Sequence, residues 1–154
     1  MKYALIISSP IGALTLVEED GALTEVRFGE KAQGVMLKST ELLERAAREL
    51  DEYFRGERRA FTIPLNPHGT PFQKRCWDAL CRIPCGETRT YAQQAAMIGN
   101  PKACRAVGMG NHRNPLPIFI PCHRVIGKNG TLTGYAGGLD IKETLLNIER
   151  MTRP

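Results

Sequence analysis

Short runs that alternate apolar and polar residues dominate the first third of the chain and predict β-strands. The predicted strands cover residues 3–9, 12–19 and 22–29. Asp20-Gly21 is turn-like and separates the last two of them. From Ser39 to Arg55 the apolar residues recur at helical spacing, which predicts a helix capped by Ser39, ended by Gly56 and packed on one face of the sheet.

The second half of the chain has the pattern of short, clearly bounded helices. Residues 70–73 and 90–93 are each a capping box, in which Gln follows Thr by three positions, and each predicts the start of a helix. Pro84 ends the first of these helices and Gly99 the second. Asn100-Pro101 then predicts that a third helix begins at once.

Two helices joined by a tight turn predict a helix-turn-helix, with the third helix in the recognition position. The sequence KNG at 128–130 predicts a hairpin turn with a return strand over 131–133, which together would form a wing. A last helix is expected from Asp140 to Arg150, with Glu149 at the edge of its apolar stripe, where an acid needs a partner. Helix pairs of this kind also occur in proteins that never bind DNA, so the pattern alone leaves the function open.

A turn-rich stretch, NPHGTP at 66–71, predicts the boundary between two domains, 1–66 and 67–154. The two parts differ in charge. Residues 1–66 contain nine Lys/Arg and eleven Asp/Glu, whereas residues 67–154 contain twelve and five. Such asymmetry indicates that the second part meets a polyanion, and a basic surface that only maintains solubility is the alternative.

No apolar run approaches membrane-spanning length, and the one at the N-terminus stops at Ser8, too early for a secretory signal. We therefore expect a soluble intracellular protein without a membrane partner. The five cysteines are an odd number, which argues against a disulfide framework. They form no CxxC pair, so no metal site is expected.

The segment NPLPIFIPCHRVIG, residues 114–127, places a cysteine and a histidine side by side after three prolines. Proline restricts both itself and the preceding residue, so the approach is expected to be extended and stiff and to aim Cys122. Arg124 is placed to stabilise a thiolate, and Glu149 to orient His123 as the third member of a relay. Adjacent residues of an extended chain point opposite ways, so a thiolate–imidazole contact needs a turn here or an intervening water.

Three interpretations of this pair stay open on the residues alone. A single cysteine is more often a packing residue than a nucleophile. A reactive Cys122 with His123 fits a cysteine hydrolase, although no oxyanion hole is evident. A DNA-binding regulator explains the basic half but leaves the Cys-His pair without a use.

Taken together, the motifs closely resemble those of the methylated-DNA–protein-cysteine methyltransferases, or O6-alkylguanine-DNA alkyltransferases. IPCHRVIGKNGTLTGYAGGL is similar to the family's nucleophile motif, GNPKACRAVG to its recognition helix and TYAQQAA to the preceding helix. The resemblance runs from about Phe72 to Glu149, and the first 66 residues share only the layout. It implies an α+β fold, in which a small ribonuclease-H-like sheet with a helix precedes a winged helix-turn-helix domain.

The resemblance implies a role for each matching residue of the reaction site. Cys122 matches the alkyl acceptor, His123 its base acting through a water, and Glu149 the acid that orients this histidine. Asn114 matches an asparagine that braces the site. Tyr91 matches the tyrosine that rotates the target phosphate and donates a proton toward guanine N3.

On the DNA side, Arg105 matches the finger that fills the duplex after the target base is extruded. The small residues of its helix would allow a close fit in the minor groove: Ala103, Ala106 and Gly108. Tyr135 matches a pocket wall and Ala136 a backbone donor toward O6, where some relatives have serine. His112, at the end of the recognition helix, is expected to contact a phosphate or solvent.

The implied activity is direct-reversal DNA repair, in which an alkyl group passes once from O6-alkylguanine, or O4-alkylthymine, to Cys122 after base flipping. The implied partner is double-stranded DNA, approached from the minor groove, and no cofactor or metal is implied. We expect a monomer in the cytoplasm, associated with the nucleoid if the source is bacterial. Alkyltransferase-like proteins bind alkylguanine without repairing it and lack the cysteine, so the presence of Cys122 favours the enzyme.

Overall fold

The computed structural model describes residues 1–154 and divides into two compact units. The first unit contains Met1–His68 together with Thr152–Pro154, and the second contains Gly69–Met151. The chain was expected to divide after residue 66, with its last residues in the second unit. Instead residues 152–154 belong to the first unit, in which the backbone N–H of Arg153 donates to the carbonyl of Gly56 at 3.3 Å. No helix has the length and apolar character that crossing a membrane requires.

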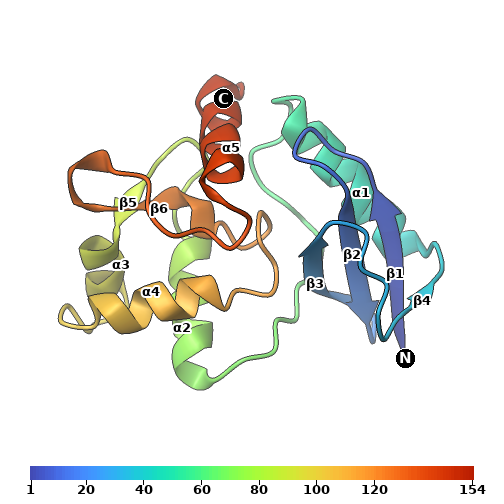
Figure 1. Ribbon diagram of the computed structural model, residues 1–154, viewed down its shortest axis with the longest axis horizontal. Helices are drawn as coiled ribbons and strands as arrows, with labels where there is room; N and C mark the ends of the chain where they lie inside the picture. Colours follow the sequence, from blue (N-terminus) through green and yellow to red (C-terminus); the bar gives the residue numbers. More distant parts are fainter. The chain divides into compact units, whose positions relative to one another are not determined.

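The first unit is a sheet covered on one face by a helix (Figure 1). Its elements are β1 (Lys2–Ile7), β2 (Leu14–Glu19), β3 (Ala22–Phe28), β4 (Met36–Leu37) and α1 (Glu41–Phe54). The first three strands form the expected antiparallel meander, and the unpredicted β4 pairs in parallel with β1, so that the strand order is β3-β2-β1-β4. The core between sheet and helix consists of buried aliphatic side chains, among them Leu14, Leu16, Leu23, Leu43 and Leu50.

The helix of the first unit is capped by a different residue from the one predicted. Thr40 is the N-cap, because its hydroxyl accepts the N–H of Leu43 at 3.1 Å. Ser39 instead donates its hydroxyl to Glu44 at 2.8 Å. Gly56 follows the helix with a left-handed φ of 74°, which ends it as expected.

The second unit is mainly helical (Figure 1). Its elements are α2 (Pro71–Cys81), β5 (Arg89–Thr90), α3 (Tyr91–Met97), α4 (Cys104–His112), β6 (Val125–Ile126) and α5 (Leu139–Met151), with 3-10 turns at Cys122–Arg124 and Lys128–Gly130. Both predicted capping boxes are confirmed, since Thr70 and Thr90 exchange hydrogen bonds with the glutamines three residues later. Gly99 follows α3 with a φ of 78°, which ends that helix as predicted.

Two predicted details of this unit are wrong. Asn100-Pro101 does not open the recognition helix but forms a turn, in which the Asn100 carbonyl accepts the N–H of Ala103 at 3.0 Å, and α4 begins only at Cys104. No return strand follows residue 130, and β6 pairs in parallel with β5 rather than in a hairpin. The segment expected to form the hairpin wing is therefore a 3-10 turn beside a two-stranded parallel sheet.

Helix α4 is held against α2 and α3 by buried polar contacts. The indole N–H of Trp77 donates to the Gly110 carbonyl at 2.9 Å, and the amides of Gln94 and Asn111 exchange hydrogen bonds of 2.9 and 2.7 Å. A Cβ at Gly110 would lie 3.1 Å from the sulfur of Cys76, so glycine permits this close approach. The contacts fix which face of α4 meets solvent, and its exposed residues are Arg105, Ala106, Met109 and His112.

Candidate active site

Cys122 begins a 3-10 turn at the end of the proline-rich segment. The segment is folded rather than extended, because the N–H of Ile120 donates to the Leu116 carbonyl at 2.8 Å and Ile118 adopts a φ of 77°. The prediction of an extended approach is wrong. The turn that a Cys-His contact requires is present at Cys122 itself.

Asn114 ties this loop together. Its side-chain amide donates to the carbonyl of Ile120 at 2.8 Å, and its side-chain oxygen accepts the N–H of Leu116 at 2.9 Å. The amide also interacts with the thiol of Cys122 in the sense that favours the thiolate. Asn114 therefore fixes both ends of the loop and the position from which the thiol emerges.

The turn buries His123 and brings it to Glu149 of α5. The ring Nε2 lies 2.5 Å from a carboxylate oxygen of Glu149, and both side chains are almost fully buried. Burial lowers the pKa of His123 and outweighs the opposite effect of Glu149, so the imidazole is neutral at pH 7. A neutral ring whose Nε2 donates to the carboxylate has its lone pair on Nδ1.

Arg124 binds Glu149, and the predicted contact with a thiolate is wrong. Its Nε and Nη2 donate to the two carboxylate oxygens at 2.8 and 3.1 Å, and its Nη1 donates to the carbonyl of Ile83 at 2.6 Å. Burial acts to raise the pKa of Glu149, but hydrogen bonds from His123 and Arg124 and the positive charge of Arg124 hold the pKa well below its usual range. Arg124 thus keeps Glu149 ionised at its contact with His123.

Sequence reasoning missed Lys142, which is fully buried on α5. Its ammonium donates to the carbonyls of Val125 and Thr133 at 2.6 and 2.7 Å. Lys142, Leu145 and Glu149 lie at positions i, i+3 and i+7 of one helix face. In the sequence, two charged residues within this otherwise apolar helix stripe were the signal that could have identified Lys142 as a functional residue.

The electrostatics of the cluster leave Cys122 protonated at rest. Burial raises the pKa of Cys122 to about 11, against the opposing effects of Asn114 and of the positive charge on Lys142. Burial lowers the pKa of Lys142 to about 8, so the lysine is still mostly charged at pH 7. The charges of Arg124 and Glu149 offset each other in their ion pair, so the positive charge of Lys142 is the one that favours loss of the thiol proton.

We expect Lys142→Met to raise the pKa of Cys122 further and to slow alkyl transfer. A neighbouring opposite charge changes a pKa by about 1–3 units, so the loss in rate at pH 7 should be at least about tenfold. The pH dependence of alkylation of the thiol reports its pKa directly. Lys128→Met removes an exposed lysine and should leave both quantities unchanged. A folded Lys142→Met protein with the wild-type thiol pKa would contradict this role.

Tyr135 lies close to the same cluster, whereas Ala136 is exposed. Burial raises the pKa of Tyr135 well above its usual value, and the charges of Cys122 and Glu149 raise it further, which places the phenol near both. Tyr91 stands at the first position of α3, and its hydroxyl lies 3.4 Å from the Thr133 carbonyl.

The residues predicted to face DNA surround the start of α4. Arg105 and Ala106 are exposed, while Ala103 and Gly108 are partly covered. A Cβ at Gly108 would meet the ring of Tyr91 at 3.8 Å, so this ring borders the same face. One surface therefore joins the recognition helix to the N-terminus of α3.

Both units match known protein families. Residues 71–151 match the family described as 6-O-methylguanine DNA methyltransferase, DNA binding domain, and residues 1–67 match its ribonuclease-like domain. A constitutive methylated-DNA–protein-cysteine methyltransferase of Bacillus subtilis is 50% identical over 161 residues, covering 99% of this chain and 98% of the relative. A methyltransferase of that name from Methanosarcina acetivorans is 52% identical and covers 96% and 97%.

Among solved structures, Mycobacterium tuberculosis OGT in complex with DNA is similar to this chain with a TM-score of 0.91 and 44% identity, covering 96% of this chain and 92% of that one. The α+β fold, with a ribonuclease-like and a DNA-binding domain, is the one that the resemblance implied. The chain belongs to the 6-O-methylguanine DNA methyltransferase family.

Proposed function

We propose that the protein repairs alkylated DNA by direct reversal and moves the alkyl group of O6-alkylguanine onto the sulfur of Cys122. The observation that carries this proposal is the buried His123–Glu149 pair, 2.5 Å apart, immediately behind a partly exposed cysteine. Relatives at 50% and 52% identity are named as methyltransferases of this kind, which supports the same reaction here.

The proton of Cys122 has a defined path in this proposal. Because Nε2 of His123 faces Glu149, the basic nitrogen is Nδ1, and it takes the thiol proton through a water. Glu149 stabilises the imidazolium that forms, and Arg124 holds this carboxylate in place. Lys142 supplies the positive charge that the new thiolate requires.

The thiolate then displaces guanine from the alkyl carbon. A sulfur–carbon bond forms, the bond between carbon and O6 breaks, and the electron pair leaves on the guanine. A proton from the hydroxyl of Tyr91 to N3 neutralises the leaving base. Tyr135 forms a wall of the pocket, and the backbone N–H of Ala136 donates toward O6.

In-line attack requires the target nucleotide to leave the base stack, which costs a few kcal/mol. In the proposal α4 enters the minor groove, where its small residues permit close approach: Ala103, Ala106 and Gly108. Arg105, exposed on this helix, fills the space left by the flipped base. The basic residues concentrated in 67–154 attract the phosphates.

The same site would accept O4-alkylthymine, since the reaction occurs at the alkyl carbon and not at the ring. The proposal involves duplex DNA as the partner, and the relative of known structure in complex with DNA supports it. It also includes action as a monomer, and a location in the cytoplasm where chromosomal DNA is accessible.

Mass mapping after reaction with O6-methylguanine duplex tests this function. We expect one methyl group on the peptide that contains Cys122. We expect none on the other four cysteines, which lie elsewhere in the second unit: Cys76, Cys81, Cys85 and Cys104. Cys81 is the internal control, because it is the most exposed of them and would react first with a freely diffusing methylating agent. A methyl on Cys81, or an unmodified protein, would contradict the proposal.

A further inference from the structure

One bulky apolar side chain lies on the exposed face of α4. Met109 is 59% exposed, whereas the opposite face of the helix packs on α2 and α3. Ala106, three residues before Met109 on that face, is small and does not cover it. A single exposed apolar side chain is common on protein surfaces, so it is the position of Met109 on the face of α4 that carries Arg105 that points to a partner.

Helical spacing places Met109 beside the predicted finger. Met109 follows Arg105 by four residues, so the two side chains lie on one face, about 6 Å apart along the axis. His112 follows Met109 by three residues on the same side and is also exposed. The face therefore has a cationic, an apolar and a polar group in series.

We propose that Met109 is a second DNA-contacting residue, whose side chain packs into the minor groove against the sugars and base edges next to the flipped nucleotide. The inference rests on the proposed function, since it requires α4 to face DNA. Minor-groove proteins insert apolar side chains, methionine among them, at opened base steps. A flipped nucleotide creates such a step, and Arg105 fills only the position of the missing base.

Methionine suits this place for a physical reason. It is unbranched and flexible, so it adapts to a groove whose width varies with sequence. It has no charge, so its contribution to affinity does not depend on counterion release. Met109 would thus add a salt-insensitive contribution to the charge-driven binding of the basic half.

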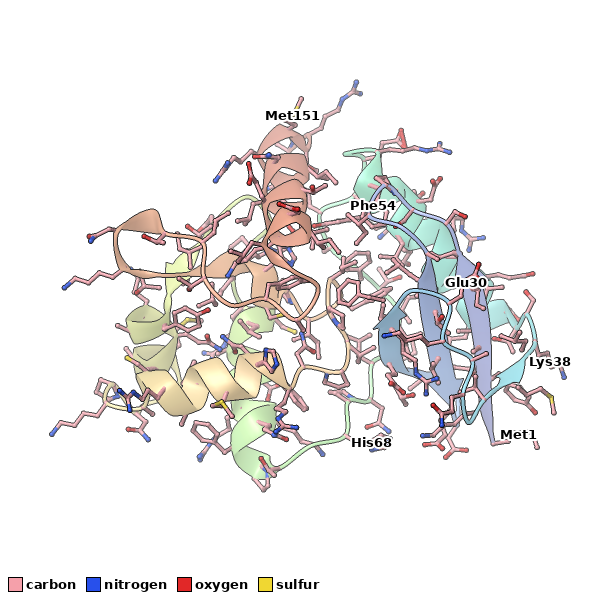
Figure 2. All side chains as sticks on the ribbon, in the orientation of Figure 1. Met1, Glu30, Lys38, Phe54, His68 and Met151 are labelled. Carbon is pink, nitrogen blue, oxygen red and sulfur yellow. The ribbon has the colours of Figure 1, made fainter.

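The experiment measures the affinity of Met109→Ala for O6-methylguanine duplex over a range of salt concentrations. Loss of one buried methionine should weaken binding on the order of tenfold, with the salt slope unchanged. Met109→Leu keeps an apolar side chain of similar size and should bind as wild type. Met151→Ala is the matched control: Met151, labelled at the end of α5 in Figure 2, is 84% exposed, and its removal should have no effect.

The transfer rate gives a second readout. Met109→Ala should slow repair of duplex more than repair of single-stranded substrate, where no base step has to be opened. Binding by Met109→Ala equal to that of the Met151→Ala control would overturn the inference, even if methyl transfer to Cys122 proceeds normally. Self-association that Met109→Ala abolishes, at unchanged DNA affinity, would overturn it as well. Absence of methyl transfer in the wild-type protein would instead count against the proposed function.

Discussion

Given an excess of duplex containing O6-methylguanine, the protein is expected to repair about one lesion per molecule and then stop. The S-methyl thioether is a poor leaving group, so a second nucleophile does not displace the sulfur from the methyl carbon. Nothing in this cluster is placed to attack the thioether. Repaired and unrepaired lesions are counted against protein concentration, and the plateau should not move with longer incubation.

Cys122→Ser should bind the damaged duplex yet repair none of it, because a hydroxyl at neutral pH is a far weaker nucleophile than a thiolate. Cys81→Ser is the matched control, since it removes an exposed thiol and should leave the plateau at about one lesion per protein. Repeated turnover on this duplex would contradict a thiol that is used once, whereas a cysteine hydrolase would leave the duplex untouched. Repair by Cys122→Ser would exclude this sulfur as the acceptor.

Local signals in the sequence predicted the elements that frame the site. Both capping boxes act within four residues, and both helices begin where the pattern indicates. The start of α4 was mispredicted because Asn100-Pro101 is equally compatible with a tight turn, and Ala103 offers no side-chain cap. A dipeptide pattern does not separate these outcomes.

Contacts between distant segments were predictable only in part. The sequence indicated that Glu149 needs a partner, and the structure supplies two, His123 and Arg124, about 25 residues away. Arg124 was assigned to the thiolate because it is close in sequence, whereas the fold directs it to the acid. Lys142 was missed because a lysine on an amphipathic helix is normally solvent-exposed.

The same limit applies to the loop before Cys122. Three prolines indicate stiffness, and the structure shows a loop closed by hydrogen bonds, but stiffness does not fix direction. The left-handed Ile118 and the bonds of Asn114 fold the loop back on itself. Both depend on neighbours that local patterns do not reveal.

The second large effect is expected from removal of His123, the base in the relay of Cys122, His123 and Glu149. His123→Ala should slow alkyl transfer at pH 7 by about 10²–10⁴-fold, because the thiol loses its general base. With the pKa of Cys122 at about 11, only about one molecule in ten thousand holds a thiolate at that pH without help. Single-turnover rates on O6-methylguanine duplex measure the change, and lesion affinity should stay near that of wild type.

Wild type and His123→Ala should differ in how their rates of alkyl transfer depend on pH. In wild type burial lowers the pKa of His123, so the ring is neutral at pH 7; the transfer rate should stay constant above neutral pH and fall only in acid. In His123→Ala the thiolate must form by direct ionisation. Its rate should therefore rise about tenfold per pH unit toward the thiol pKa of about 11.

His68→Ala controls for the loss of a histidine as such, since His68 is exposed and lies in the first unit. Glu149→Gln tests the acid, but it leaves Arg124 buried without a carboxylate and should cost about 3–5 kcal/mol of stability, so its rate is compared only where the protein is folded. If His123→Ala showed the flat profile of wild type at a reduced rate, the histidine would be shaping the pocket rather than taking the proton. A steep rise with pH in His123→Ala alone, with His68→Ala unchanged, assigns the ionisation of Cys122 to the ring that Glu149 holds.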